Sequence, residues 1–179
     1  MCYLWNLYNI LDVPSDDEIT FADHAGRFYA RRYGMAPMVG RLLGYLSVCD
    51  PREQTIAELA DALLASRSAI AGAVSALVNL GLIKRSRAAG ERMDRVRIDM
   101  SSPQATGFDH SEYQEQVDLT QEGLDMLEGT PIERRAVLLE HNAFAKFLVQ
   151  HLPLMEQEWV KHREALRAAG ELPDASMTR

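Results

Sequence analysis

Apolar residues recur along the first half of the chain with the period of an amphipathic helix, and clear breaks divide the pattern into segments. Residues 16–33 predict a first helix, which Gly34 ends. Pro37 suits the first turn of a second helix, and the helical pattern continues from there until Asp50-Pro51 stops it.

Two short helices follow with almost nothing between them. Thr55 and Glu58 form a capping box that predicts the start of one helix, and Ser66 can cap the next, which Gly81 ends. Because Ala65 and Ser66 alone separate the two apolar patterns, the chain must turn sharply there. This arrangement predicts a helix-turn-helix.

Beyond residue 81 the pattern changes to that of a strand hairpin. Residues 82–87 and 94–100 predict two strands, with a turn at residues 88–90 between them. The second strand alternates as a half-buried ribbon requires, with Val96, Ile98 and Met100 expected on the buried face and Arg95, Arg97 and Asp99 on the other. Helix, helix and hairpin in this order predict a winged helix.

The chain after residue 100 is expected to be mainly helical. Residues 101–111 predict a loop, residues 113–119 a short strand, and Thr120 the start of a short helix that ends near Gly129.

A long helix is expected next. Thr130-Pro131-Ile132-Glu133 combines an N-cap, a proline at the first helical position and a capping-box Glu. The helix should run to about His151, where Pro153 interrupts it, and a last helix should cover residues 154–169.

The predicted fold class is therefore mainly α with a small antiparallel β wing, a winged helix-turn-helix flanked by N- and C-terminal dimerisation helices. We expect three parts: an N-terminal segment and dimerisation helix at 1–33, a winged helix-turn-helix head at 34–100, and a connecting loop with a C-terminal helical dimerisation region at 101–179. Dimerisation is expected because one small head cannot cover the two apolar terminal segments.

Charge is distributed unevenly along the chain. Residues 66–97 hold seven basic and two acidic side chains, a net +5, so the rest of this chain of formal charge -7 carries −12. A basic cluster in an acidic body is typical of a surface that binds a polyanion. A solvated charged hairpin is the other interpretation.

Several classes are disfavoured by composition. Residues 1–13 are apolar but too short to span a bilayer, and no Lys or Arg precedes Arg27, so we expect a cytoplasmic protein without a membrane partner. The five histidines lack metal-ligand spacing, and no nucleophile elbow, P-loop or dinucleotide motif is present. We expect no enzyme, no metal and no cofactor.

Three local motifs resemble one known family. The first is the entry to the second helix, Gly34-x-x-Pro37-x-x-Gly40-Arg41-x-x-Gly44. The second is the run from Thr55 to Ile83, where Leu59-Ala60, Ser66-Arg67, Val74, Leu77 and Gly81-Leu82-Ile83 have the family's helix-turn-helix spacing. The third is the hairpin turn Gly90-Glu91-Arg92-Met93-Asp94. In this order they resemble the GbsR-type branch of the MarR superfamily of winged-helix transcription regulators.

A fourth segment, Leu119-Thr120-Gln121-Glu122-Gly123, is similar to the one that opens the helix after the wing in many MarR proteins. The chain departs from the family at residues 101–118, where members run almost directly from wing to helix. The resemblance implies a dimer that binds DNA.

Candidate DNA contacts lie on the outer face of the helix that Ser66 caps and on the hairpin. Small polar residues allow a helix to approach base edges in the major groove, and Arg67 can pair with guanine or bind phosphate. At the hairpin tip, Arg92 can enter the minor groove, with Glu91 and Asp94 orienting neighbouring arginines. The candidate residues are Ser66, Arg67, Ser68, Ala71, Gly72, Ser75, Lys84, Arg85, Arg87, Arg92 and Arg95. The other interpretation is an ordinary exposed face.

Candidate effector-binding residues are aromatic side chains of the terminal segments: Tyr29, Tyr33, Phe144, Phe147 and Trp159. Such residues can surround a small apolar or cationic molecule, but aromatics at helical spacing more often form a core or a dimer interface. Cys49 follows apolar residues and is expected to be a small buried hydrophobe rather than a redox switch.

The sequence thus predicts a sequence-specific DNA-binding transcription regulator, a ligand-responsive repressor that acts as a homodimer on a pseudo-palindromic operator. Two alternatives stay open: a winged helix that binds another protein and no DNA, and a redox- or metal-sensing regulator.

Overall fold

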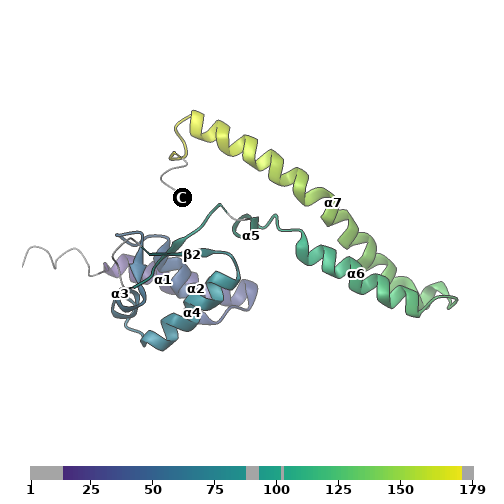
Figure 1. Ribbon diagram of the computed structural model, residues 1–179, viewed down its shortest axis with the longest axis horizontal. Helices are drawn as coiled ribbons and strands as arrows, with labels where there is room; N and C mark the ends of the chain where they lie inside the picture. Colours follow the sequence, from purple (N-terminus) through teal and green to yellow (C-terminus); the bar gives the residue numbers. More distant parts are fainter. Residues whose placement is uncertain (1–13, 88–92, 102, 175–179) are drawn as a thin grey trace, which may run out of the picture. The chain divides into compact units, whose positions relative to one another are not determined.

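The computed structural model describes residues 14–87, 93–101 and 103–174 (Figure 1). The chain divides into two compact units, Met1–Ser102 and Pro103–Arg179, which we call the head and the helical unit.

The head contains four helices and a small sheet, in the order expected for a winged helix. Its elements are α1 Asp16–Tyr33, α2 Pro37–Leu46, β1 Gln54–Thr55, α3 Ile56–Ala62, α4 Arg67–Asn79, β2 Ile83–Ser86 and β3 Arg95–Ile98. The predicted helices and hairpin are therefore confirmed, and so is the predicted class of a mainly helical chain with a small antiparallel sheet.

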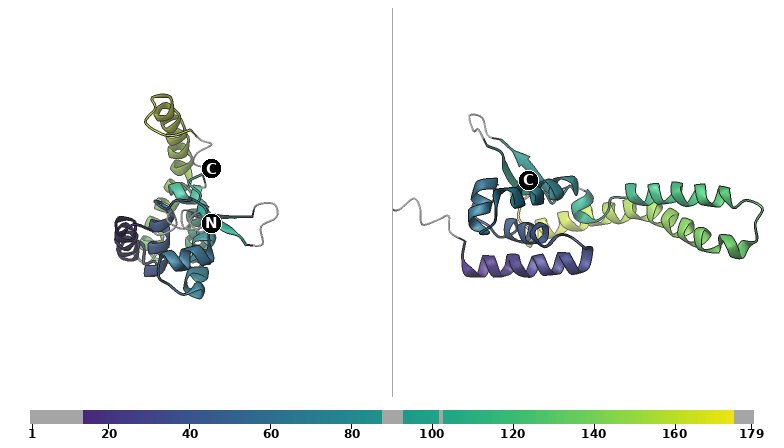
Figure 2. Two further views of the ribbon diagram at one scale, coloured as in Figure 1. Left: turned by 90° about the vertical axis from the view of Figure 1, so that its left-hand side faces the viewer. Right: turned by 90° about the horizontal axis from the view of Figure 1, so that it is seen from below.

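The sheet has the strand order β1-β3-β2 and is antiparallel throughout. Ile83 pairs with Ile98 and Ser86 with Arg95, and these two strands form a ribbon that projects from the head (Figure 2). On the other side of β3, Gln54 pairs with Val96. The sequence did not reveal β1, because two residues are too few to show an alternating pattern.

The core of the head lies beneath α4 and joins the helices to the ribbon. Its fully buried side chains are Leu42, Leu59, Leu63, Ile70, Leu77, Val74 and Val96. One expected core position is wrong. Met100 is 53% exposed while Asp99 is 3% exposed, because β3 and its alternation end at Ile98.

Glycines allow α1 and α2 to pack backbone against backbone. A Cβ atom built at Gly40 would lie 2.8 Å from the Cβ of Tyr29, and one at Gly44 would collide with the Cβ of Ala25. Gly26 of α1 closes the same seam, where an added Cβ would lie 3.1 Å from the carbonyl oxygen of Pro37. The spacing of Gly40 and Gly44 therefore serves this helix contact.

The helical unit consists of α5 Pro103–Thr106, α6 Ser111–Met126 and α7 Ile132–Ala168, of which α6 and α7 lie side by side as a helical hairpin (Figure 2). The strand predicted at residues 113–119 is wrong, since these residues belong to α6. Tyr113, Gln116 and Val117 are half-buried and Thr120 is buried, which is the spacing of one helix face. The predicted loop at 101–111 also contains the one-turn helix α5.

The interruption expected at Pro153 is also wrong, because α7 continues through it as one helix. A proline removes a single backbone donor, and the helix on both sides sustains the remaining hydrogen bonds.

The cap expected from Thr130 is absent. The Thr130 hydroxyl donates to the carbonyl oxygen of Leu127 (2.7 Å), and Pro131 precedes the first helical residue.

One polar pair fixes α6 against α7. The Asn142 side chain is buried and donates through Nδ2 to Thr120 Oγ1 (2.9 Å) and to the carbonyl oxygen of Val117 (3.1 Å). Gly123 lies opposite Leu138, where an added Cβ would be 2.9 Å from a leucine methyl group. These contacts set the register of the helical hairpin.

Candidate nucleic-acid interface

The outer face of α4 is small, polar and exposed. Ser66 caps the helix by accepting a hydrogen bond from the amide of Ala69 (3.1 Å), as its position in the sequence predicts. Ala71 is half-buried, and the exposed candidates on this helix are Arg67, Ser68, Gly72 and Ser75. A Cβ at Gly72 would meet no heavy atom within 4 Å among its neighbours in the described residues, so the centre of the face is open.

The burial of the opposite face explains this orientation. Ile70, Ala73, Val74 and Leu77 point into the core at helical spacing, so their neighbours in sequence must point outward. The face is thus a direct consequence of the apolar pattern.

The ribbon adds cationic side chains beside this face. Lys84, Arg85 and Arg87 are exposed on β2 and directly after it. Arg85 donates from Nη2 to Ser75 Oγ (3.4 Å), while the Ser75 hydroxyl donates to the carbonyl oxygen of Ala71 (2.9 Å). Helix and ribbon therefore present one continuous surface that includes Ser75 and Arg85.

Two ion pairs join side chains on β2 and directly after it to side chains next to the ends of β3. Arg87 Nε donates to Asp94 Oδ1 (2.7 Å), and Lys84 Nζ lies 2.7 Å from Asp99 Oδ2. Burial by itself would raise the pKa of the Asp99 carboxyl, but hydrogen bonds from Lys84 and Ser101 outweigh it and lower this pKa to about 2. Lys84, a candidate DNA contact from the sequence, is thus also the partner of a buried carboxylate.

Arg95 and Arg97 have acidic partners outside the basic cluster counted along the sequence. Arg95 Nη1 donates to Glu58 Oε2 (3.2 Å) and to the backbone oxygen of Glu53 (3.2 Å), and Arg97 Nε lies 3.0 Å from Glu53 Oε1. Their side chains are 29% and 24% exposed. The fold therefore uses these two arginines to attach β3 to α3 and to the segment before it. Arg95 as a DNA contact stays a prediction.

Arg92 and Glu91, expected at the tip of the wing, lie outside the described residues. Met93, the next residue that the structure describes, is 57% exposed. The minor-groove role of Arg92 stays a prediction.

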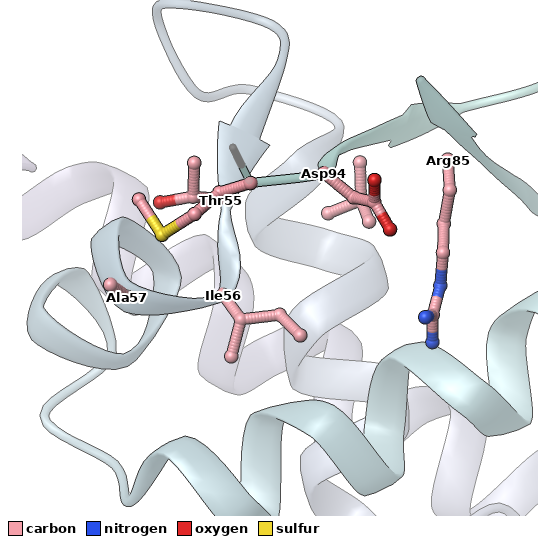
Figure 3. Close-up of a pocket in the computed structure, with 7 residues that line it drawn as sticks. Thr55, Ile56, Ala57, Arg85 and Asp94 are labelled. Atoms are coloured by element: carbon pink, nitrogen blue, oxygen red, sulfur yellow. The ribbon is translucent and has the colours of Figure 1, made fainter. Parts of the chain in front are cut away.

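A shallow pocket of about 190 Å³ lies between the start of α3 and the ribbon (Figure 3). Its wall is formed by Thr55, Ile56, Ala57, Met93 and Val96, with Arg85 and Asp94 as its charged residues. Figure 3 shows the Arg85 side chain extending from β2 toward a neighbouring helix. The five aromatic effector candidates are not among the residues that line this pocket in the described part of the chain.

Those aromatic candidates fall on two helices of different units. In α1, the rings of Tyr29 and Tyr33 stack with centroids 6.0 Å apart. In α7, Phe144 and Phe147 are 56% and 52% exposed, and Trp159 is half-buried. Their role in binding an effector stays a prediction.

Cys49 is 5% exposed in the core of the head. Burial raises the pKa of its thiol to about 11, so the reactive thiolate is scarce at neutral pH. This agrees with the interpretation of Cys49 as a small buried hydrophobe.

Within the described ranges, no three His, Cys, Asp or Glu side chains gather as ligands for a metal ion. None of the helices described is by itself long and apolar enough to cross a membrane, and α3 and α4 meet that test only as a pair bent by 115°.

Two protein-family models match consecutive parts of the chain. Residues 33–92 match the MarR family, and residues 104–164 match the MmpR5-like MarR family transcriptional regulators. The first match covers most of the head, from the end of α1 into the hairpin turn, and the second covers most of the helical unit.

Individual proteins are also similar to the chain. The HTH-type transcriptional regulator MmpR5 of Mycobacterium tuberculosis (strain ATCC 25618 / H37Rv) is 38% identical over 82 residues, which are 46% of this chain. The match spans 49% of MmpR5, about half its length. A crystal structure described as that of a transcriptional regulator superposes with a TM-score of 0.74 at 29% identity, covering 81% of this chain and 99% of that one. The two family models name the MarR family and its MmpR5-like regulators, and neither names the GbsR-type branch.

Proposed function

From a head and a helical unit that both match the MarR family of winged-helix transcription regulators, we propose that this chain regulates transcription by binding double-stranded DNA. The observation that carries the proposal is the surface shared by α4 and the ribbon, where Arg85 reaches Ser75 beside the open position at Gly72. A small polar helix face next to exposed cations is what a major-groove reader requires.

Each part of this surface has a distinct task in the proposal. The outer face of α4 enters the major groove, where Arg67 in its first turn contacts a base edge or a phosphate. Arg85 and Arg87 bind phosphates along the backbone, and such contacts set affinity rather than sequence preference. The acidic remainder of the chain opposes indiscriminate adhesion to DNA.

We further propose that the chain acts as a homodimer on a pseudo-palindromic operator. Support comes from the helical unit, where many large apolar side chains are exposed: Leu119, Met126, Ile132, Val137, Leu139, Phe144, Phe147, Leu154 and Met155. A monomer rarely leaves so many apolar side chains in water, so a second copy is expected to cover them. Two symmetric heads then bind two half-sites.

The finer assignments are also proposals. The motif from Gly34 to Gly44 supports a GbsR-type member of the superfamily, and the aromatic residues of α1 and α7 support release of DNA by a small molecule. We place this regulator in the cytoplasm, where DNA is accessible. A winged helix that binds a protein instead of DNA is the competing function.

The test is to select bound duplexes from a random DNA pool with the full chain, and then to titrate the selected duplex with two variants. Arg67→Ala should cost about 1 to 3 kcal/mol and relax the preference at one base position per half-site. Arg85→Ala should weaken binding to all duplexes alike and lower the slope of log affinity against log salt by about one unit.

The control is Arg31→Ala, which removes an exposed arginine of α1 and should leave binding unchanged. If the pool yields no enriched sequence, or if both variants bind the selected duplex as tightly as the parent, the DNA-binding proposal fails and the protein-interaction module replaces it.

A further inference from the structure

Arg41 joins three helices of the head through one guanidinium group. Its Nε donates to Asp23 Oδ1 of α1 (2.6 Å), and its Nη1 donates to the backbone oxygen of Leu63 at the end of α3 (2.7 Å). The side chains of Arg41 and Asp23 are 23% and 44% exposed, so water screens their ion pair in part.

The glycine seam between α1 and α2 permits this arrangement. Arg41 follows Gly40 and precedes Gly44 in α2, and its own Cβ would lie 3.3 Å from a Cβ built at Gly26 of α1. A larger residue at Gly26 would push α1 away from Arg41 and so separate Asp23 from the guanidinium. The glycines of the second-helix motif thus let α1 come close enough to α2 for Arg41 to bind Asp23.

The carbonyl group that Arg41 binds belongs to Leu63, in the turn of the helix-turn-helix. Leu63 caps the C-terminal end of α3, and Leu64 follows in the left-handed region with φ 49°. A non-glycine residue pays a steric cost in that region, so the turn needs support from its surroundings. A cation at the last carbonyl groups of a helix supplies such support.

This turn also sets the direction of α4. The axes of α3 and α4 are bent by 115°, and Leu63 to Ser66 are the residues that connect them. Because Leu64 is 94% exposed, packing of its own side chain does little to fix the turn. The buried side chain of Leu63 and the hydrogen bond from Arg41 to the Leu63 carbonyl group therefore together restrain the angle at which α4 meets a groove.

We infer that Arg41 is a positioning residue for the recognition helix α4, and that Asp23 of α1 acts through it by orienting the guanidinium. The inference rests on the proposed DNA binding and deepens it, because α1 then helps to set the orientation of α4 through Asp23 and Arg41. A displacement of α1 relative to α2 changes the Arg41 contact with the turn, and with it the fit of α4 to its half-site.

The experiment compares the full chain with Arg41→Met, Arg41→Lys, Asp23→Asn and the matched control Arg31→Met, which replaces an exposed arginine of α1. The main readout is the ratio of affinities for the selected duplex and a random duplex of equal length. Loss of stability alone lowers both affinities alike and leaves this ratio unchanged, whereas a misdirected α4 lowers the ratio.

Arg41→Met should lower the ratio about tenfold, as expected for the loss of charged hydrogen bonds. Asp23→Asn should lower it less and should have no further effect in the Arg41→Met background, because Asp23 acts through Arg41. Arg41→Lys, which keeps the charge but cannot serve two acceptors through a planar fork, should recover part of the loss. Arg31→Met should match the parent.

A second readout does not depend on DNA. The amide of Ala65 donates to the carbonyl oxygen of Ala60 (2.9 Å) within the turn, so Arg41→Met and Asp23→Asn should speed its hydrogen exchange while the amide of Leu77 in α4 keeps its rate. If the parent selects no duplex, the proposed function fails and this exchange measurement decides the inference by itself. Unchanged exchange at Ala65, or an unchanged affinity ratio in Arg41→Met and Asp23→Asn, would overturn the inference.

Discussion

At the scale of single residues, the fold shows that a count of charges along the sequence does not give the charge of a surface. The window from residue 66 to residue 97 includes Arg95 and Arg97, yet their partners Glu53 and Glu58 lie outside it. Lys84 likewise pairs with Asp99 outside the window, so the exposed cations next to α4 are fewer than the count suggests, and Arg67, Arg85 and Arg87 carry most of the expected attraction to DNA. Pairing between distant segments requires knowledge of the sheet register, which the sequence does not show.

Lys84 and Asp99 allow a test of stability against pH. The pKa of Asp99 is about 2 in the folded chain, below its ordinary value of 3.8, so the folded state favours the charged carboxylate. The resulting stabilisation is fully present above pH 4 and is lost as the pH falls toward 2.

In Lys84→Met the buried carboxylate loses its cation and its pKa rises. The parent should therefore be more stable than Lys84→Met near neutral pH, and the two should converge as the pH approaches 2. Asp99→Asn, which cannot titrate at this position, should weaken the dependence of stability on pH in that window. Urea unfolding at a series of pH values checks this, and a constant difference between parent and Lys84→Met from pH 7 to pH 2 would contradict the assignment.

At the scale of elements, strong local signals predicted the head well. Capping residues, glycine stops and apolar spacing gave the ends of α1, α3 and α4 within a residue or two, because each signal acts on the backbone next to it. The outer face of α4 followed from the same pattern.

Elements whose form depends on tertiary contacts were predicted less well. The segment from Tyr113 to Leu119 has apolar residues at 113, 117 and 119, a strand-like spacing that Glu115 interrupts, yet it is helical because one helix face packs on α7. Pro153 usually marks a helix end, but the surrounding helix keeps α7 continuous. The strand β1 exists through its pairing with β3. Tertiary packing decided the first of these cases and strand pairing the third, and neither kind of contact has a local signature.

The turn between α3 and α4 gives a prediction about strain. Leu64 has φ 49° and is 94% exposed, so replacing it by glycine removes a steric cost without removing buried surface. Leu64→Gly should stabilise the chain by about 1 kcal/mol relative to Leu64→Ala, which keeps the strained backbone and likewise removes the exposed side chain. Denaturant unfolding of both variants provides the comparison. A lower stability of the glycine variant would show that the left-handed conformation is not strained.

At the scale of the whole molecule, binding to a pseudo-palindromic operator requires two copies of the chain. One chain has a mass of 20.1 kDa, and light scattering at micromolar concentration should give about twice that value. Phe144 and Phe147 are each more than half exposed, so changing both to Ser should shift the population toward the mass of one chain. Leu64→Ser serves as the control, because it removes an exposed apolar residue of the head. A parent that scatters as a single chain would remove the basis for a symmetric operator.

The central claim is that the outer face of α4 enters DNA, and Gly72 offers the most direct test of it. A side chain added there meets open space, so Gly72→Glu and Gly72→Gln should both fold with parent-like stability while differing only in charge. The measurement is a binding titration of both variants against the duplex selected by the parent, at one fixed salt concentration. A carboxylate placed against the negatively charged duplex should make Gly72→Glu bind at least about a hundredfold more weakly than Gly72→Gln. Equal, parent-like binding by the two variants would show that this face of α4 does not contact DNA.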